Sequence, residues 1–299
     1  MTLRSGILLI DKPPVLTSHD VVARTRKRAD TRKVGHAGTL DPMATGLLVL
    51  GINNSTRLLT FVVGLDKEYF ATIRLGAATN TDDAEGETTS SADASGLSRE
   101  EIDAALAPLR GKISQVPSSV SAIKVAGQRA YTLARAGEEV LLAARAVTVS
   151  TLEVLEVVPT ESFIDIQVRV VCSSGTYIRA IARDLGAALG VGGHLTALRR
   201  TRIGPFSIAD ASTLETLDVA EALLEPAAVA GLLFDTYPLT EPQAIDLGHG
   251  KRLRDDAVPN SVAPMAAISP DGRLVGLIEF ADGVAKPIVN FPPDRTSRS

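Results

Sequence analysis

Three stretches of the chain alternate between apolar and polar residues with the two-residue period of a β-strand, namely 67–76, 147–157 and 163–172. The last two follow one another closely and predict an antiparallel pair. Two shorter runs, 6–10 and 46–50, are continuously apolar and predict buried strands. Strands are therefore expected at these five places.

Helix-capping signals separate some of these strands. Thr17 or Ser18 can cap a helix after the first apolar run. Ser98 and Glu101 form a capping box that opens a helix running to Leu109. Two helices are therefore expected at these places.

A third helix is predicted over residues 177–189, after a cap signal in Ser173–Thr176. It carries Arg179 and Arg183, which lie one turn apart. Residues 198–206 then predict a strand with basic side chains. Basic groups from a helix and a strand thus follow each other in this part of the chain.

The C-terminal part has a different pattern. Residues 212–233 are acidic and rich in Ala and Leu, and they predict peripheral helices before a boundary near 235–240. Short apolar runs separated by Asp-Gly turns follow and predict a small β-rich module. We therefore expect two domains, 1–235 and 236–299.

Composition favours a globular cytoplasmic protein. The chain has 299 residues with 45% hydrophobic content, which is ample for a packed core. No apolar run reaches the roughly 18 residues of a membrane helix, and the N-terminal residues do not resemble a signal peptide. The single cysteine, Cys172, predicts a buried thiol in a reducing compartment. The four histidines lack ligand spacing, so no zinc site is implied.

Charge is segregated along the chain although the net charge is only −4. Residues 1–78 hold 11 Lys and Arg against 6 acids, whereas residues 79–108 hold 1 against 8. The acidic stretch 80–98 predicts a long exposed loop. Residues 24–33 place six cations around one acid. They form either a solvated helix face or a stripe that binds phosphate.

A Gly-rich stretch at 35–46, GHAGTLDPMATG, presents one carboxylate, that of Asp41. Glycine tolerates positive φ, and Pro42 disfavours a helical conformation at Asp41, so the carboxylate can point out of the loop. Asp41 is therefore a candidate catalytic residue. The alternative is that Asp41 only turns or caps the chain before the next apolar run, which is the commoner role of such a residue.

A catalytic Asp41 needs a counter-ion and a surface that holds the substrate. Arg179 is a candidate counter-ion, and its alternative is a surface arginine. Tyr69 and Tyr177 can stack on a flat base, and their alternative is a core position. His36 most simply organises its own loop by hydrogen bonding. These residues alone leave both interpretations open.

Residues 35–48, GHAGTLDPMATGLL, resemble the signature of the TruB family of tRNA pseudouridine synthases. Five further blocks occur in the order of that family: LIDKP at 9–13, KEY at 67–69 with LG at 75–76, QVP at 115–117 with SAIK at 121–124, CSSGTYIR at 172–179, and LRR at 198–200. Six ordered blocks are far more specific than one, and they favour the catalytic interpretation of Asp41. The resemblance covers about residues 5–210, and the C-terminal strands resemble a PUA-type RNA-binding domain.

The resemblance implies an α+β fold with a large mixed, mostly antiparallel β-sheet flanked by helices, followed by a small C-terminal β-rich domain. It implies that Asp41 is the essential carboxylate, that Arg179 is its salt-bridge partner and that Tyr69 stacks on the target uracil. The residues expected to contact the RNA substrate are Lys12, His36, Lys124, Tyr177, Leu198, Arg199 and Arg200.

The implied reaction converts uridine to pseudouridine in the T-loop of tRNA, at position 55. It breaks the C1′–N1 bond, turns the base and remakes the bond at C5, so it requires neither a cofactor nor a metal. A carboxylate can attack the sugar or assist elimination to a glycal, and Tyr69 or Asp41 can remove the C5 proton. We expect a monomer that binds tRNA without a guide RNA, an obligatory protein partner or a membrane.

Three alternatives remain at this level. An RNA-binding or tRNA-folding protein could carry the same basic segments, with catalysis secondary. A guide-RNA-dependent pseudouridine synthase would share the same core. A glycoside hydrolase needs a second carboxylate, and nothing in the sequence pairs Asp184 with Asp41.

Overall fold

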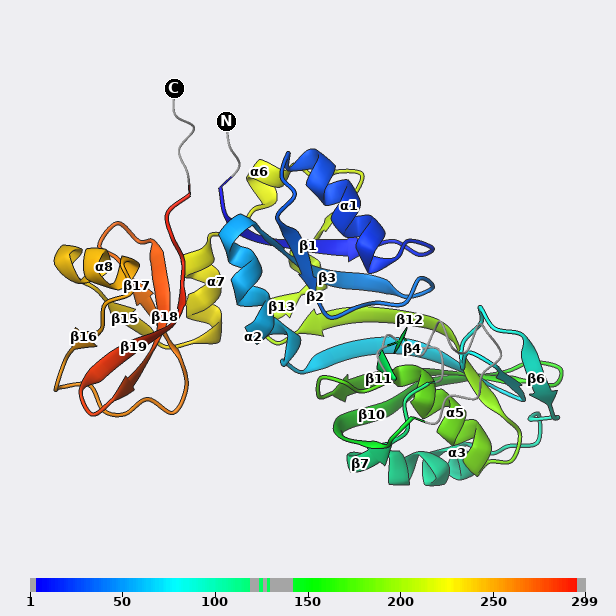
Figure 1. Cartoon of the computed structure of the whole chain (residues 1–299). Helices are drawn as coiled ribbons and strands as arrows, with labels where there is room; N and C mark the ends of the chain where they lie inside the picture. Colours follow the sequence, from blue (N-terminus) through cyan, green and yellow to red (C-terminus); the bar gives the residue numbers. More distant parts are fainter. Residues whose placement is uncertain (1–3, 119–123, 126–127, 130–141, 295–299) are drawn as a thin grey trace. The chain divides into compact units, whose positions relative to one another are not determined.

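The computed structural model describes residues 4–118, 124–125, 128–129 and 142–294 (Figure 1). The chain divides into two compact units. The first unit holds the chain up to Asp41, Leu47–Val63 and the chain from Pro205, and the second unit holds Pro42–Gly46 and Gly64–Gly204. Asp41 is thus the last residue of the first unit before the chain enters the second. None of the described helices is long and apolar enough to cross a membrane.

The first unit combines segments from both parts of the sequence. Before residue 64 its elements are β1 (Gly6–Lys12), α1 (Ser18–Arg28), β2 (Val34–Ala37), β3 (Thr45–Ile52), the 3₁₀ helix η1 (Asn53–Leu58) and α2 (Leu59–Val63). After residue 204 they begin with β13 (Phe206–Ser207), η3 (Ile208–Asp210), β14 (Ser212–Thr213), α6 (Val219–Ala222) and α7 (Pro226–Leu233). The C-terminal β-rich domain, described below, also belongs to this unit. β1 pairs in parallel with β14, and β2 pairs antiparallel with β3. Apolar side chains of β1, α1 and β3 share one buried core.

The second unit is built around an antiparallel sheet with the strand order β12–β4–β11–β10–β7. Its elements are β4 (Lys67–Leu75), β5 (Ala77–Thr79), β6 (Thr88–Ser91), α3 (Arg99–Leu106), η2 (Ala107–Leu109), β7 (Gly111–Gln115), β8 (Lys124–Val125), β9 (Gln128–Arg129), β10 (Arg145–Pro159), β11 (Ile164–Cys172), α5 (Ile178–Ala188) and β12 (Gly193–Ile203). Thr45 and Gly46, the first residues of β3, pair in parallel with β12. The predicted fold class, a mixed and mostly antiparallel sheet with flanking helices, is confirmed.

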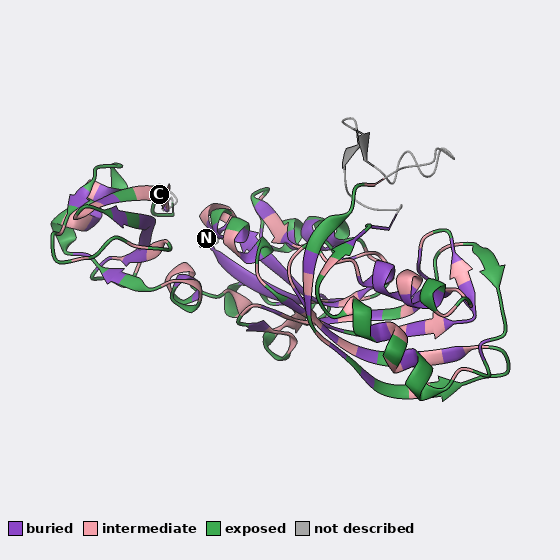
Figure 2. Cartoon of the chain, turned by 90° about the horizontal axis from the view of Figure 1, so that it is seen from below, coloured by how far each residue is buried: buried purple, intermediate pink, exposed green. Residues whose placement is uncertain are grey.

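Side-chain alternation explains which face of this sheet is covered. Along β4 and β11 every second residue is buried, because strand side chains point alternately to the two faces. Helices α3 and α5 pack on the buried face, next to β10 and to β12 and β4 respectively (Figure 1). Burial of one large aliphatic side chain such as Ile73 or Ile166 stabilises the fold by about 1.5–3 kcal/mol. Figure 2 shows the buried residues concentrated along the strands.

The C-terminal β-rich domain has its own sheet and its own core. Its elements are β15 (Thr236–Pro238), α8 (Glu241–Gly248), β16 (Leu253–Arg254), β17 (Met265–Ile268), β18 (Leu274–Ala281) and β19 (Val284–Asn290), with the strand order β15–β17–β18–β19–β16. Tyr237, Leu247 and Phe280 belong to its apolar core. This β-rich module was predicted, while the boundary between residues 235 and 236 stays a prediction.

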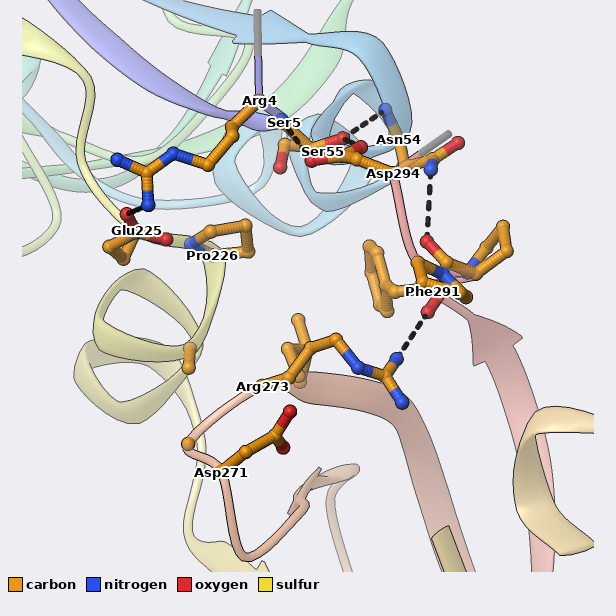
Figure 3. A pocket seen from close by; sticks show the side chains of 15 residues that line it. Arg4, Ser5, Asn54, Ser55, Glu225, Pro226, Asp271, Arg273, Phe291 and Asp294 are labelled. Carbon is orange, nitrogen blue, oxygen red and sulfur yellow. Dashed lines mark hydrogen bonds and ion pairs between the residues drawn. The ribbon is translucent and has the colours of Figure 1, made fainter. Parts of the chain in front are cut away.

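The segment after β19 returns to the N-terminal strand of the first unit. The carboxylate of Asp294 accepts from the backbone amide of Ser5 at 2.6 Å and also from its hydroxyl. The side-chain amide of Asn54 donates to the carbonyl of Pro292 at 3.0 Å. Figure 3 shows these contacts beside a cavity of about 220 Å³, into which Arg4 and Arg273 also extend. The C-terminal domain is thereby tied to β1 and η1.

Two predicted helix caps are confirmed and one is wrong. Thr17 caps α1 in a capping box with Asp20, and Ser98 caps α3 in one with Glu101. α5 begins at Ile178, one residue later than predicted, with Tyr177 at the N-cap position and no hydrogen bond from a capping side chain at that residue. The physical reason is that a distant side chain, described below, satisfies the backbone of this helix end.

Two other expectations also differ from the structure. Residues 34–37 form strand β2 instead of loop, because their backbone pairs with β3. The stretch 80–98, expected as an exposed loop, contains β6 and a turn whose residues Asp82 and Asp83 are buried. The sequence after residue 131 also predicts a short helix that ends near Gly137, and this helix lies outside the described residues.

Candidate active site

The backbone that leads to Asp41 is anchored to α1. The hydroxyl of Ser18 accepts from the amide of Leu40 at 2.9 Å and donates to the carbonyl of Leu40 at 3.2 Å. Ser18 is buried in the first turn of α1, so its side chain is itself held in place. Asp41, which is half-buried, therefore extends from a backbone that is fixed immediately before it.

Lys12 and His36, two predicted RNA contacts, also lie in the first unit. Lys12 is fully buried, and its ammonium group donates to the carbonyls of Pro13 at 2.9 Å and Leu16 at 2.6 Å. It thereby organises the turn after β1. The half-buried ring of His36 meets the ring of His19 edge-on, with centroids 5.5 Å apart. Contacts of Lys12 and His36 with RNA stay predictions.

The second unit brings Tyr69, Leu198 and Arg200 onto one face of its sheet. Tyr69 on β4 stands directly opposite Arg200 on β12, and Leu198 stands opposite Ala71. Opposed residues of neighbouring strands share a face, with Cβ atoms about 5 Å apart. All four side chains are buried, and that of Arg200 is 1% exposed. Tyr69 is thus a buried aromatic beside a buried guanidinium.

Arg199 lies on the opposite face of the sheet from Arg200. Consecutive strand residues alternate, so these two predicted RNA contacts point in opposite directions. The guanidinium of Arg199 donates to the hydroxyl of Thr45 at 3.3 Å and is only half-buried. The sequence grouped both residues as phosphate contacts, and the strand geometry separates them. Their roles towards RNA stay predictions.

A second buried cation lies on the Tyr69 face. Lys67 precedes Tyr69 by two positions on β4, and its ammonium group donates to the carbonyl of Leu65 at 2.6 Å. Burial, with the neighbouring charge of Arg200, lowers the pKa of Lys67 to about 8. Burial also raises the pKa of the Cys172 thiol, opposite Lys67 on β11, to about 11. Two basic side chains, Lys67 and Arg200, are thus buried on the same face of the sheet as Tyr69.

Arg179 is buried at the start of α5 and is not a surface arginine. Its Nη1 lies 3.3 Å from Oδ2 of Asp83 and donates to the carbonyl of Thr81 at 2.9 Å. The hydroxyl of Thr81 donates to the other oxygen of Asp83 at 2.6 Å, so the carboxylate is also oriented. The structure therefore gives Arg179 a carboxylate partner in Asp83. The predicted salt bridge of Arg179 with Asp41 stays a prediction.

Tyr177 is held through its backbone by Gln115. The side-chain amide of Gln115 donates to the carbonyl of Tyr177 at 3.1 Å and accepts from its amide at 2.8 Å. These two hydrogen bonds satisfy the backbone amide and carbonyl of Tyr177 at the N-terminus of α5. The predicted cap signal at Ser173–Thr176 does not do so. Lys124 belongs to β8, and its side chain lies outside the part of the chain that the structure describes.

Sequence reasoning missed Asp83 and its neighbour Asp82. The acidic stretch that contains them was interpreted as an exposed loop, which is wrong for these two residues, since Asp83 as a whole is 3% exposed and Asp82 is 8% exposed. The signal that could have found them is two consecutive acids in one segment and two arginines one turn apart, at 179 and 183, in another. In the described residues, no group of three or more His, Cys, Asp or Glu side chains could hold a metal ion.

Comparison with known proteins identifies the family. Three family models match consecutive parts of the chain: TruB family pseudouridylate synthase (N terminal domain) over residues 26–178, tRNA pseudouridylate synthase B C-terminal domain over 179–232, and tRNA Pseudouridine synthase II, C terminal, over 234–292. The chain belongs to the TruB family of pseudouridylate synthases. The resemblance predicted from six sequence blocks is thereby confirmed.

Relatives in the TruB family match nearly the whole chain. A tRNA pseudouridine synthase B from Leifsonia xyli subsp. xyli is 60% identical over 294 residues, 97% of each chain. One from Arthrobacter sp. is 54% identical over 297 residues, again 97% of each chain. This TruB family member is therefore an enzyme of the tRNA pseudouridine synthase class, an isomerase, as predicted.

Solved structures share the fold of this TruB family member. The first is an H/ACA RNP bound to a substrate RNA containing 2′-deoxyuridine, with a TM-score of 0.70 at 24% identity over 97% of this chain and 86% of that one. The second, a Cbf5-Nop10-Gar1 complex, has a TM-score of 0.70 at 25% identity over 96% and 85% of the two chains. Both likenesses support the α+β fold class.

Proposed function

We propose that the enzyme isomerises uridine to pseudouridine in the T-loop of tRNA, at position 55, with Asp41 as the essential carboxylate. The observation that carries this proposal is the double hydrogen bond of Ser18 to Leu40, which fixes the backbone immediately before Asp41. A reacting carboxylate must be held in one orientation to act, and a loop anchored next to it provides that. The relatives named tRNA pseudouridine synthase B support tRNA as the substrate.

The carboxylate of Asp41 either attacks C1′ of the target nucleotide or assists elimination to a glycal, while the C1′–N1 bond breaks. The released uracil turns and forms the C5–C1′ bond. The proton then leaves C5, with Tyr69 or Asp41 as the base, and N1 gains a proton, so the product is an isomer of the substrate. Water has to be excluded because hydrolysis would release the base, and the buried side chains of Tyr69 and Leu198 support such exclusion.

The target uridine must leave its stack before it can react, at a cost of a few kcal/mol. Stacking on Tyr69 and contacts with RNA phosphates would offset that cost. The six cations of residues 24–33 are exposed on and after α1, as a phosphate-binding stripe requires. The remaining predicted contacts are Lys12, His36, Lys124, Tyr177, Leu198, Arg199 and Arg200.

The proposed enzyme works as a monomer in the cytoplasm, without a guide RNA, a cofactor or an obligatory protein partner. The competing candidate is a guide-dependent synthase, considered because one structural neighbour is an H/ACA RNP bound to a substrate RNA. An RNA-binding or tRNA-folding protein in which catalysis is secondary is the other candidate. Each makes a different prediction for the isolated chain.

The test uses purified protein and an unmodified tRNA transcript, with no added metal, nucleotide or second RNA, followed by mapping of pseudouridine. We expect product at position 55 and also on an isolated T-stem-loop. Product that appears only with a guide RNA would favour the guide-dependent candidate, and tRNA binding without product would favour the RNA-binding one.

The Asp41→Asn variant tests the carboxylate. We expect it to bind tRNA like the wild type and to form pseudouridine at least a thousandfold more slowly, because the amide is a poor nucleophile and carries no charge. The matched control is Asp30→Asn, which removes an exposed carboxylate from the same unit and is expected to retain full activity. An Asp41→Asn variant with the wild-type rate would overturn the assignment.

A further inference from the structure

Two consecutive acids in the turn between β5 and β6 face two arginines one turn apart on α5. Asp83 pairs with Arg179, as described above, and Oδ2 of Asp82 lies 3.3 Å from Nη1 of Arg183. A single ion pair lets two elements pivot about the contact, whereas two pairs side by side fix their relative rotation. The second pair is therefore placed to control the geometry of the first.

The backbone at Asp82 supports a role for its carboxylate. Its φ is +61°, in the left-handed region that glycine or asparagine adopts most easily. Its backbone carbonyl also accepts from the amide of Leu195 on β12 at 3.0 Å. In this turn the carboxylates of Asp82 and Asp83 both face arginines of α5.

Arg183 also contacts a third segment. Its Nη2 donates to the carbonyl of Val116 at 2.7 Å, next to Gln115, which holds the backbone of Tyr177. Asp184 accepts from Arg183 as well, at 2.9 Å. One guanidinium thus joins the β5–β6 turn, residues 115–116 and the first turns of α5.

We propose that the Asp82–Arg183 pair is a positioning pair for Arg179 in the pseudouridine-forming reaction. It acts through the Asp83–Arg179 pair, by holding the β5–β6 turn in one rotation on α5, and not by touching the substrate. The inference rests on the proposed function, in which Arg179 is the counter-ion of the reacting carboxylate. A displacement of such a group by about 1 Å can slow a reaction by two orders of magnitude.

The test is a double-mutant cycle with Asp82→Asn, Arg183→Gln and the double variant. Asparagine keeps the shape of Asp82 and tolerates its φ, so the turn is retained while the charge is lost. We expect each single variant to slow pseudouridine formation about tenfold at saturating enzyme in single turnover. The double variant is expected to be no slower than the slower single variant, because the two residues act as one unit.

The matched control is the Arg74–Asp165 pair in the same sheet. Its side chains are 34% and 21% exposed, against 29% and 12% for Arg183 and Asp82, and its shortest N–O distance is 2.6 Å. Asp165→Asn and Arg74→Gln should leave the single-turnover rate within twofold of the wild type. All variants should bind tRNA with dissociation constants within twofold of the wild type, which separates positioning from a loss of binding or folding.

Three results would contradict the inference while the wild type remains active. They are an Asp82→Asn rate no lower than that of Asp165→Asn, a rate loss accompanied by an equal loss of tRNA affinity, and losses that simply multiply in the double variant. A wild-type chain that forms no pseudouridine would instead overturn the proposed function, and the inference with it.

Discussion

Arg179 and Asp83 form an ion pair inside the second unit, with Nη1 3.3 Å from Oδ2 and side chains 5% and 4% exposed. At this degree of burial, water cannot take the place of either partner in the pair. Breaking a buried ion pair by removing one partner typically costs about 3–5 kcal/mol. The orientation of Arg179 therefore depends on Asp83, a residue in a different supersecondary element.

Removal of Asp83 should affect both stability and activity. We expect Asp83→Ala to lower the free energy of unfolding by about 3 kcal/mol and to slow pseudouridine formation more than tenfold. Urea denaturation and single-turnover assays measure the two effects. The control Asp165→Ala breaks a more exposed pair and should cost about 1 kcal/mol without slowing the reaction. Equal effects of both variants on the rate would contradict the role of Asp83.

Lys67 should make stability rise with pH above about 8. Its pKa is lowered from 10.5 to about 8 in the folded protein, chiefly by burial, so between these values the unfolded chain binds more protons than the folded one. The free energy of unfolding then increases with pH, by up to about 1.4 kcal/mol per pH unit. At pH 9 the wild type should gain about 1 kcal/mol over pH 7.5 relative to Lys67→Met.

Denaturation at pH 7.5 and 9 measures this difference, and the comparison with Lys67→Met subtracts the contribution of Cys172, which both proteins contain. The pKa of that thiol is raised to about 11, so its contribution to stability falls as pH rises from 9 towards 11. A difference between the wild type and Lys67→Met that stays constant from pH 7.5 to 9 would show that Lys67 has an ordinary pKa.

Gly46 should tolerate no side chain. Its φ is +103°, and a Cβ would stand 2.2 Å from the carbonyl oxygen of Arg200, in the backbone of β12. Alanine at positive φ usually costs about 1 kcal/mol. Gly46→Ala should lower the free energy of unfolding by more than this, because the Cβ also meets the backbone of β12. Gly111→Ala, where φ is +79° and the Cβ would enter open space among the described residues, should show the backbone cost alone. Similar melting temperatures for the two variants would contradict the close approach.

The cation stripe of residues 24–33 should set the salt dependence of tRNA binding. Lys27→Gln and Arg28→Gln remove exposed charges, so each should weaken binding and reduce the slope of log affinity against log salt by about 0.7–0.9. The reaction rate at saturating enzyme should stay unchanged. Arg99→Gln is the control, because Arg99 lies in the acidic segment and pairs with Asp103. A slope that is equally reduced by Arg99→Gln would indicate a non-specific charge effect.

The strands and two of the caps could be predicted because their signals are local. Alternation in 67–76 and 163–172 follows from one covered sheet face, and both capping boxes lie within four residues. The Gly-rich segment and its single carboxylate were also evident from local chemistry. Family resemblance then gave the candidate residues.

The partners of the site could not be predicted because they come from distant segments. Gln115 replaces a local cap at Tyr177 from 62 residues away, and Arg179 binds an acid from a stretch whose composition is typical of a loop. Strand alternation also separated Arg199 from Arg200, which the basic run had grouped together. Composition averages over a segment, while each of these contacts depends on one side chain.

The division of the chain between its two units has a consequence for synthesis. The second unit lies within residues 42–204, whereas β1 of the first unit pairs with β14, whose residues Ser212 and Thr213 come about 200 positions later. A nascent chain can therefore complete the second unit while β1, which has β3 as one neighbour, still lacks β14 on its other edge. Contacts of such sequence separation form slowly. We expect the edge of β1 that β14 covers to stay accessible to chaperones on the ribosome until Ser212 and Thr213 have been made.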